Sequence, residues 1–294
     1  MTSHQPRSSY ILTISCADVP GIVRAVSGFL ADRGWTITQS QQFDDPQTGM
    51  FFMRLQFSPA KGTPAPAGPD TDRLRAEFAP VAHQFAMTWR LADAADRQRV
   101  LLMVSKFGHC LNDLLFRWSI GALHVDVAAV VSNHPDFGRL AGSYGIPFHH
   151  VPVTAQTKPQ AEERLLAVVE QTGAELVILA RYMQVLSEDL CKELEGKAIN
   201  IHHSMLPSFK GARPYHQAHE RGVKLIGATA HYVTPDLDEG PIIEQEVARM
   251  DHAMSAEEVA ALGRDVECQA LARAVRWHSE NRVLLNGRRT IVFR

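Results

Sequence analysis

The segment from Asn200 to Ile242 carries the densest set of chemically capable residues in this chain of 294 residues. It holds a histidine pair, further histidines and several acids, yet no cysteine. Imidazole and carboxylate groups can bind a metal ion, exchange protons with a substrate, or simply hydrogen-bond within a folded protein. The choice therefore lies between a metal site, ordinary polar residues and a metal-free acid–base centre.

A metal site is disfavoured by the spacing of its possible ligands. His216 and His219 are three residues apart and could share a helix face, but the H-E-x-x-H spacing of zinc proteases is absent. His202 and His203 are neighbours on an expected strand, so they should face opposite sides, and at most one could join a given site. The cysteines form no C-x-x-C pair; they are Cys16, Cys110, Cys191 and Cys268. We expect no metal, and we expect His216 and His219 on a solvated helix face.

A nucleotide site and a nucleophile are weakly supported. The stretch SKFGHCLNDLL follows an expected strand and opens a helix, whose free N–H groups could bind an anion, but it has one glycine and no phosphate-loop pattern. No G-x-S-x-G turn is present. Cys110, at the start of that helix, is expected to be a packed core thiol.

Asn200 and His202 are better candidates for acid–base chemistry. They lie two apart on an expected strand, so both side chains should point the same way, at the carboxyl end where open α/β sheets bind ligands. An amide beside an imidazolium can polarise a carbonyl. A carboxylate from the loop PDLDEG, which holds Asp236, Asp238 and Glu239, could activate water. From the residues alone, an ordinary strand with no catalytic role is also compatible.

The N-terminal part predicts six elements in the order βαββαβ. Alternating and β-branched residues predict strands at 10–16, 35–43, 50–57 and 84–91, and apolar spacing predicts helices at 22–31 and 72–81. This order is that of a ferredoxin-like split βαβ sandwich. The Pro- and Gly-rich stretch at 58–70 then becomes a surface loop inside a first domain over residues 8–93, and the boundary falls in the polar stretch 94–98.

The second part, residues 98–294, alternates strand and helix. Apolar runs without alternation, such as RVLLMVSK, indicate strands buried on both faces, so we expect a parallel doubly wound sheet. AINIHHS and GATAHYVT should continue that sheet, and PIIEQEVARM should add an antiparallel edge. A long helix is expected over 255–280, opening with the capping box of Ser255 and Glu258. RVLLNGRRTIVF predicts a hairpin with Asn286-Gly287 at a type I′ turn.

Composition narrows the classes of partner and compartment. A formal net charge of −2 argues against a surface dedicated to nucleic acid or membrane. The N-terminus has no apolar signal core, and no stretch approaches the ~18 apolar residues of a membrane helix. Scattered cysteines fit reduced thiols. We expect a cytoplasmic protein.

Two segments around the candidate acid–base residues resemble the signature of a known family. NIHHSMLPSFKG and GATAHYVTPDLDEGPI resemble the signature of the folate-dependent formyltransferase superfamily: N-I-H-x-S-x-L-P, a histidine-bearing strand, and a loop ending D-x-G-P. The segment HHSMLPSFKGARPYHQAHERGVKLIGATAHYV is similar to the hydrolytic branch, the formyltetrahydrofolate deformylases. DVPGIV resembles an ACT domain. The resemblance covers nearly the whole chain. It implies an α/β protein with an N-terminal ferredoxin-like ACT domain and a Rossmann-like, mostly parallel formyltransferase domain.

The resemblance also implies a reaction and its residues. Asn200, His202 and Asp238 match the catalytic residues of a hydrolase that converts 10-formyltetrahydrofolate to formate and tetrahydrofolate in one-carbon metabolism, with formate supplied to purine biosynthesis. It implies no cofactor besides the folate substrate. It implies a pteridine pocket that is lined by the segment 181–186 and crossed by the loop 234–238. The folate-binding residues that it implies are Met183, Gln184, Val185, Leu186, His231, Thr234 and Asp236. Glu239 stands where many relatives carry glycine.

Two further expectations and two alternatives complete the prediction. An amino-acid effector, glycine or methionine, is expected at the turn from Asp18 to Gly21, and the ACT domain suggests a homotetramer. One alternative is a formyltransferase with another acceptor, such as glycinamide ribonucleotide. However, SKFGHC departs from the glycine-rich loop of those transferases, which suits water as the acceptor. The other alternative is a non-catalytic, ACT-regulated folate sensor.

Overall fold

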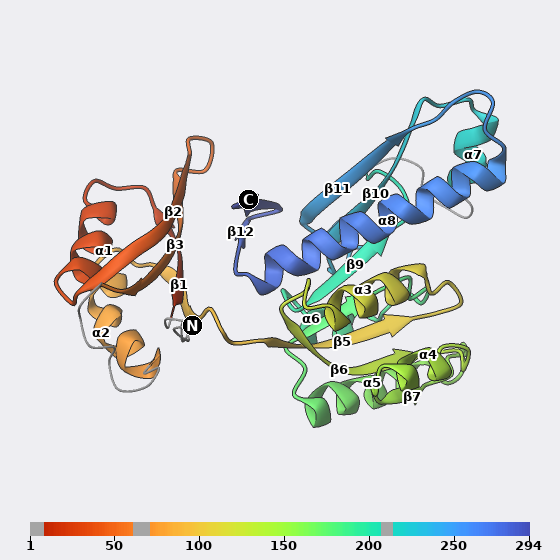
Figure 1. The fold of residues 1–294 in the computed structure, drawn as a ribbon, viewed down its shortest axis with the longest axis horizontal. Coiled ribbons are helices and arrows are strands. Elements are labelled where there is room, and N and C mark those ends of the chain that lie inside the picture. Colours follow the sequence, from red (N-terminus) through yellow and green to blue (C-terminus); the bar gives the residue numbers. More distant parts are fainter. Residues whose placement is uncertain (1–8, 61–70, 207–213) are drawn as a thin grey trace, which may run out of the picture. The chain divides into compact units, whose positions relative to one another are not determined.

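The computed structural model describes residues 9–60, 71–206 and 214–294, and it forms two compact units (Figure 1). One unit comprises residues 1–96 together with 280–286 and 291–294, and the other comprises 97–279 together with 287–290. The division at Asp96 agrees with the boundary expected at 94–98. The expected loop at 58–70 falls mostly outside the described residues.

The N-terminal unit has the predicted βαββαβ order. Its elements are β1 (Tyr10–Ala17), α1 (Ile22–Ala31), β2 (Trp35–Asp45), β3 (Met50–Pro59), α2 (Thr71–Gln84) and β4 (Thr88–Asp93). The strands pair in the order β2-β3-β1-β4, and every pairing is antiparallel. The last strand starts four residues later than predicted because α2 extends to Gln84, where Phe78 and Ala82 share its buried face.

Alternation along the strands divides this sheet into two faces. On one face, residues such as Leu12, Ile14, Met53 and Leu55 pack with α1 and α2 in a continuous core. On the other face, Phe52 is fully buried although it belongs to no part of that core. Other residues than those of α1 and α2 must therefore shield this second face of the sheet from solvent.

The C-terminal segment supplies contacts on that second face. Arg54, which is 2 % exposed, donates to the backbone carbonyls of Glu280 and Asn281 at 3.0–3.3 Å. Asn286 donates to the buried carboxylate of Asp45 at 2.6 Å. The expectation that all of 98–294 forms the second domain is therefore wrong at its end, because this polar anchoring is invisible in the hydrophobic pattern.

The C-terminal hairpin is present, with its turn one residue later than predicted. Strands β12 (Val283–Asn286) and β13 (Arg289–Val292) flank the two residues Gly287 and Arg288. Gly287 has φ +60°, the left-handed conformation that glycine adopts without strain. Asn286 belongs to the strand, since its amide is engaged with Asp45, so the type I′ turn centred on Asn286-Gly287 is not formed.

The second unit is a doubly wound α/β structure. Its elements are β5 (Gln98–Val104), α3 (His109–Ser119), β6 (Val125–Ser132), α4 (Gly138–Ser143), β7 (Phe148–His150), α5 (Lys158–Thr172), β8 (Leu176–Leu179), α6 (Glu188–Glu193), β9 (Ala198–His202), α7 (Pro214–Glu220), β10 (Leu225–Tyr232), β11 (Ile242–Arg249) and α8 (Ala256–Ser279). The strand order is β11-β10-β9-β8-β5-β6-β7.

Five of these strands are parallel to one another, and the other two, β10 and β11, form antiparallel pairs. Strands β7, β6, β5, β8 and β9 run in one direction. The prediction that β10 continues the parallel sheet is wrong: it pairs with β9 in the antiparallel sense, and β11 pairs antiparallel to β10. The described part of the β9–β10 connection contains only the short α7, which packs against α8, and no crossover helix that would return the chain in parallel.

Helices cover both faces of this sheet (Figure 1). Helix α8 packs against β9, β10, β11 and α3. Helices α5 and α6 contribute Leu165 and Leu190 to the core on the other side. The capping box is formed: Glu258 accepts from the Ser255 N–H at 2.7 Å and donates its own N–H to the Ser255 hydroxyl at 3.2 Å. Because the chain goes from β5 to β6 on one side and later to β8 on the other, ligands are expected at the carboxyl ends of β5 and β8.

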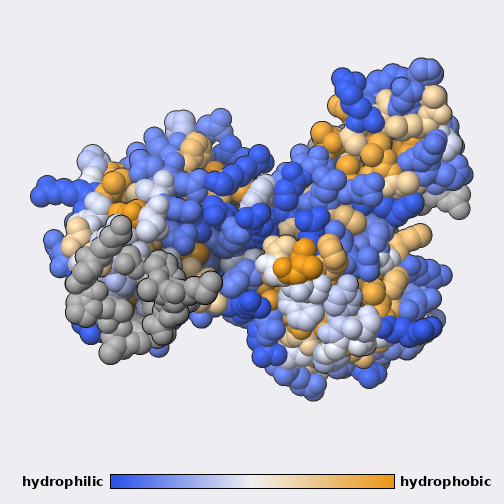
Figure 2. All heavy atoms as spheres, in the orientation of Figure 1, coloured by the Kyte–Doolittle hydropathy of each residue, from blue (hydrophilic) through white to orange (hydrophobic). Residues whose placement is uncertain are grey.

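The molecular surface is mostly hydrophilic on the face that Figure 2 displays, and its hydrophobic residues are exposed singly or in small groups. Among the described residues, no helix is both long and apolar enough to cross a membrane.

Candidate active site

A cavity of about 230 Å³ lies at the carboxyl ends of β8 and β9. All three residues of the expected triad, Asn200, His202 and Asp238, line it. Asn200 and His202 come from β9 and point the same way, as their spacing predicted. Asp238 comes from the loop after β10, so the antiparallel turn of the chain is what brings the carboxylate to the strand.

Asn200 is oriented by a histidine on the neighbouring strand. His231 lies directly opposite Asn200 in the β9–β10 pairing. Its Nδ1 donates to the carbonyl of Tyr232 at 2.9 Å, so in the neutral ring Nε2 is the acceptor for the Asn200 amide at 3.3 Å. This fixes the Asn200 side chain with its N–H₂ group toward His231, and the carboxamide keeps a second N–H for a ligand.

His202 is held by Asp238. Its Nδ1 lies 3.2 Å from Oδ1 of Asp238. The opposite ring nitrogen, Nε2, is buried and has no hydrogen-bond partner among residues 9–60, 71–206 and 214–294. A buried polar atom without a partner costs free energy unless a ligand satisfies it. Nε2 is therefore the atom of His202 that is available to a substrate oxygen.

The backbone around Asp238 is strained and tightly packed. Asp238 has φ +59°, a left-handed conformation that is uncommon for residues other than glycine, although aspartate tolerates it better than most. Two residues later, Gly240 passes so close to β10 that a Cβ atom would lie 1.8 Å from the carbonyl oxygen of Tyr232. The Tyr232 N–H also bonds to the Pro241 carbonyl at 3.0 Å. The D-x-G-P pattern is thus a device that holds the carboxylate against the two histidines.

Electrostatics keep Asp238 ionised. Burial alone would raise the pKa of this carboxyl, but the hydrogen bond from His202 and the charge of that ring outweigh it and hold the pKa well below its usual range. Oδ1 of Asp238 lies 3.7 Å from Nε2 of His231 in addition to its contact with His202.

His203 joins the same cavity, contrary to the expectation that neighbouring histidines face opposite sides. Strand β9 ends at His202, so the alternation of side chains ends there too. The rings of His202 and His203 lie 5.2 Å apart, and His203 lines the cavity. Burial, the charge of Arg181 and the neighbouring His202 lower the pKa of His203 to about 4.

Most of the expected folate-binding residues line the cavity. Met183, Gln184, Val185 and Leu186 lie after β8, and His231 and Thr234 lie on β10 and just beyond it. Asp236 is an exception: it is exposed and absent from the described lining, and only its carbonyl takes part in the loop, as acceptor from the Thr234 hydroxyl at 3.0 Å. The side chain of Asp236 therefore lies outside the cavity.

Some lining residues lie outside the segments 181–186 and 234–238, in which the resemblance places the folate pocket. They are Leu179, Cys191, Ile201, His203 and Val233. The position of Ile201 and His203 beside Asn200 and His202, at the carboxyl end of a strand, was the signal that could have marked these two.

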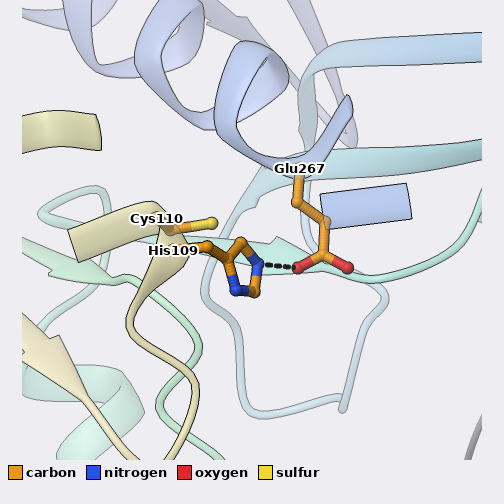
Figure 3. Close-up of side chains that lie close together, drawn as sticks. All are labelled: His109, Cys110 and Glu267. Atoms are coloured by element: carbon orange, nitrogen blue, oxygen red, sulfur yellow. Dashed lines mark hydrogen bonds and ion pairs between the residues drawn. The ribbon is translucent and has the colours of Figure 1, made fainter. Parts of the chain in front are cut away.

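A second cluster joins α3 and α8 beside this site (Figure 3). His109, Cys110 and Glu267 place possible ligand atoms within 4.8 Å of one another. Yet both oxygens of Glu267 already accept hydrogen bonds, from His109 Nε2 at 2.7 Å and from the Tyr215 hydroxyl at 2.7 Å, and Arg181 lies 3.3 Å away. Burial raises the pKa of Cys110 well above its ordinary value, so the thiol is protonated. The cluster fits a buried polar network better than a metal centre.

His216 and His219, the other histidines considered as metal ligands, both lie on α7. Nε2 of His219 lies 3.1 Å from the backbone carbonyl of Met254, so this side chain connects α7 to a second segment of the chain. His216 is half-buried, so neither residue belongs to a fully solvated face. Cys110 is fully buried, as expected for a packed core thiol.

Comparison with known proteins decides the family. A formyl transferase family model matches residues 98–275, and an ACT domain model matches residues 10–58. The chain is 54 % identical over 286 residues to a protein of Corynebacterium named formyltetrahydrofolate deformylase, covering 97 % of this chain and 98 % of that one. The chain belongs to the formyltetrahydrofolate deformylase family. A relative of the same name from Bacillus subtilis is 46 % identical over 283 residues.

Solved structures agree with this family. The formyltetrahydrofolate deformylase of Burkholderia mallei matches 98 % of this chain and 100 % of its own at 55 % identity, with a TM-score of 0.92. A glycinamide ribonucleotide transformylase of Symbiobacterium toebii matches 67 % of this chain and 95 % of its own at 29 % identity, with a TM-score of 0.64. An ACT domain precedes the formyltransferase domain here, so the predicted α/β class and domain order are confirmed.

Gly240→Ala should destabilise the protein by roughly 1–3 kcal/mol, the usual cost of overpacking, because the new methyl group meets backbone rather than a flexible side chain. Urea unfolding measures it. Gly142→Ala in α4 is the matched control: its Cβ meets nothing within 4 Å, and we expect it to be neutral or stabilising. Equal stability of the two variants would contradict the close approach.

His203→Gln should reduce the loss of stability in acid. The pKa of this histidine is about 6.5 in the unfolded chain and about 4 in the folded protein. The unfolded chain therefore binds more protons between these two values, and the free energy of unfolding falls as the pH falls through that window. At pH 5 the loss amounts to about 2 kcal/mol. Asp238, with its lowered pKa, stays ionised in both states for most of that window.

The measurement is the difference in unfolding free energy between pH 7.5 and pH 5. It should be about 2 kcal/mol smaller in His203→Gln than in the unchanged protein. His252→Gln, at a side chain that is 89 % exposed, is the control and should leave the difference as it is. An unchanged difference in His203→Gln would show that His203 titrates normally.

Proposed function

We propose that this protein hydrolyses 10-formyltetrahydrofolate to formate and tetrahydrofolate. The observation that carries the proposal is the cavity in which an ionised carboxylate, an imidazole and a carboxamide converge, in a chain 54 % identical to a named deformylase along almost its entire length. A non-catalytic folate sensor would have no use for a strained aspartate at this point.

Asn200 and His202 are the groups that would stabilise the transition state. When water adds to the formyl carbon, negative charge develops on the formyl oxygen. The unpartnered Nε2 of His202 and the second N–H of the Asn200 amide are the donors suited to that oxygen. For Nε2 to donate while Nδ1 faces Asp238, His202 must be an imidazolium, and the neighbouring carboxylate stabilises that charge.

Asp238 would orient the attacking water and receive its proton as the new C–O bond forms. Its lowered pKa makes it a weak base toward free water. Water becomes strongly acidic once it is bonded to the formyl carbon, so the carboxylate can take the proton at that stage. The departing N10 is then protonated by His202 or by water, and no step requires a metal ion or a redox cofactor.

The folate ring would occupy the apolar part of the cavity. Met183 to Leu186 form one wall, and Val233, Thr234 and Leu237 form another. Met183 and Leu237 are large hydrophobic residues left 51 % and 60 % exposed, which fits a surface covered by an aromatic ligand.

Water as the acceptor is supported by the start of α3. A Cβ atom on Gly108, the residue before this helix, would lie 2.2 Å from the ring of Phe137. His109, the first helical residue, is engaged with Glu267. The start of α3 is thus packed against the Phe137 ring and tied to Glu267, and it lacks the glycine-rich loop that would present free N–H groups to a phosphate of a ribonucleotide acceptor. We infer that formate supply, including supply for purine synthesis, is the purpose of the reaction, and that it occurs in the cytoplasm.

The N-terminal unit would bind an amino-acid effector, with glycine and methionine the first to test, within a homotetramer. Helix α1 begins after Gly21, which has φ +100° and provides no side-chain cap, so the first N–H groups of the helix are available to a carboxylate. Asp18 is exposed beside this turn and could pair with the effector's ammonium group.

Asp238→Asn should lower formate release by ~10²–10⁴-fold, the usual cost of losing an acid–base group. Asparagine has the same shape and tolerates a positive φ, so the fold should persist. The assay supplies 10-formyltetrahydrofolate alone and follows formate and tetrahydrofolate. More than about a tenth of the original rate in the variant would remove Asp238 from the chemistry.

The same assay tests the proposed function itself. The unchanged protein should produce formate and tetrahydrofolate in equal amounts with no second substrate, and should do so after treatment with a chelator. Turnover that begins only when glycinamide ribonucleotide or another amine is added would mean that the protein is a transferase.

Effector binding is tested on the full chain. Glycine or methionine should change the rate of formate release, and Asp18→Asn should raise the half-maximal effector concentration severalfold by removing a charge-assisted hydrogen bond. Asp32→Asn at the other end of α1 is the control. Light scattering should report four chains of 32.6 kDa. An unchanged response in Asp18→Asn would move the effector site elsewhere.

A further inference from the structure

Arg181 is the cavity residue that the proposed mechanism leaves without a task. It follows β8 directly and lies at the switch point of the sheet, near the end of β5, where Ser105 donates its N–H to the Arg181 carbonyl at 3.1 Å. Its φ is +68°, a left-handed conformation in which glycine would be free of strain. A long side chain at such a position indicates that the side chain itself is needed.

The guanidinium of Arg181 is buried and under-satisfied. The residue is 8 % exposed, and its side chain 10 %. Its ion pair with Glu267, at 3.3 Å, anchors it to α8, and the ring of Phe107 lies 5.9 Å from the guanidinium carbon. Nε is the atom that faces Glu267 in this ion pair, whereas Nη1 makes no hydrogen bond to any described residue. A buried guanidinium with an unused N–H group can bind an oxygen ligand.

The charge of Arg181 acts inside the active-site cavity. It lines the cavity together with Asn200, His202 and Asp238, and it is the one arginine or lysine in the described lining. It also helps to lower the pKa of His203, which lines the same cavity. A charge in a desolvated position acts more strongly than one in water.

The chemistry of hydrolysis creates a need for such a cation. Formyl transfer to an amine gives a neutral formamide. In hydrolysis, an oxygen of water bonds to the formyl carbon, the C–N10 bond breaks, and its electron pair stays on N10, which takes a proton. The second proton of the water is lost from formic acid, so the product is formate, an anion formed beside the carboxylate of Asp238.

We propose that Arg181 is the product-binding residue of this enzyme and forms a subsite for formate or another small monocarboxylate. The subsite rests on the proposed hydrolysis. Arg181 provides a positive partner for the new anion in the cavity that also holds Asp238. Glu267 keeps the guanidinium in place through their ion pair, and the hydrogen bonds from His109 and Tyr215 hold the Glu267 carboxylate itself. Formate added from solution then occupies the same subsite.

Formate inhibition of the initial rate tests the subsite. Sodium formate should inhibit the unchanged full-length protein, with sodium chloride at equal ionic strength as the reference. Arg181→Met keeps the length of the side chain and removes its charge, and it should raise the inhibition constant for formate at least tenfold, a larger factor than its effect on the KM for 10-formyltetrahydrofolate. Arg181→Lys should recover most of the formate inhibition.

Two further variants keep the test decisive. Arg181→Gly also removes the charge, relieves the strain of the positive φ instead of keeping the side-chain length, and should show the same loss of formate inhibition. Arg288→Met removes an arginine whose side chain is 79 % exposed, and the inhibition constant should stay unchanged.

The outcomes separate the subsite from the reaction. Absence of formate inhibition in the unchanged protein, or equal inhibition constants in that protein and both neutral variants, overturns the subsite while leaving hydrolysis intact. Failure of the unchanged protein to release formate from 10-formyltetrahydrofolate alone overturns the proposed hydrolysis instead.

Discussion

The contact between Asp238 and His202 is the interaction on which the rest of the site depends. It requires a carboxylate in a left-handed backbone conformation, next to a strand that leaves no room for a side chain at Gly240. Both features cost stability or restrict sequence, and they are offset by the contact with His202 that keeps the carboxylate ionised. The antiparallel direction of β10 also makes the contact possible, since it places His231 opposite Asn200 and brings the loop that holds Asp238 to the end of β9.

A second set of polar contacts supports the first from the far side. Glu267 lies on α8 and is 1 % exposed. Its carboxylate accepts hydrogen bonds from His109 and Tyr215 and forms an ion pair with Arg181, and these three residues come from three other parts of the fold. These partners matter because a buried carboxylate that loses them becomes an uncompensated charge. Helix α8 thus does more than cover the sheet: it fixes the position of the cation that borders the cavity.

The features that follow from the spacing of apolar residues along the chain could be predicted from the sequence. Strand and helix patterns placed the βαββαβ unit, the parallel strands and the capping box of α8, and the two-residue spacing of Asn200 and His202 correctly put both on one face. The segment that resembles the formyltransferase signature added Asp238. These features are local, so a single stretch of chain contains the information.

The errors arise where distant segments meet. The direction of β10 depends on how α7 packs against α8, and the place of residues 280–286 depends on Arg54 and Asp45 far away in the chain. His203 joined the cavity because β9 ends one residue earlier than the alternation implied. Arg181 and Glu267 are 86 positions apart, by subtraction of their numbers, and no pattern in either segment announces their ion pair.

A double-variant cycle on kcat/KM tests most directly whether Asp238 and His202 act as one unit. His202→Gln alone should cost ~10²–10⁴-fold. In a protein that already carries Asp238→Asn, the same substitution should cost less than about threefold, because residues that act together lose their function together. Fully additive losses, with the double variant reduced by the product of the two single effects, would contradict the account and show that the carboxylate and the imidazole work independently.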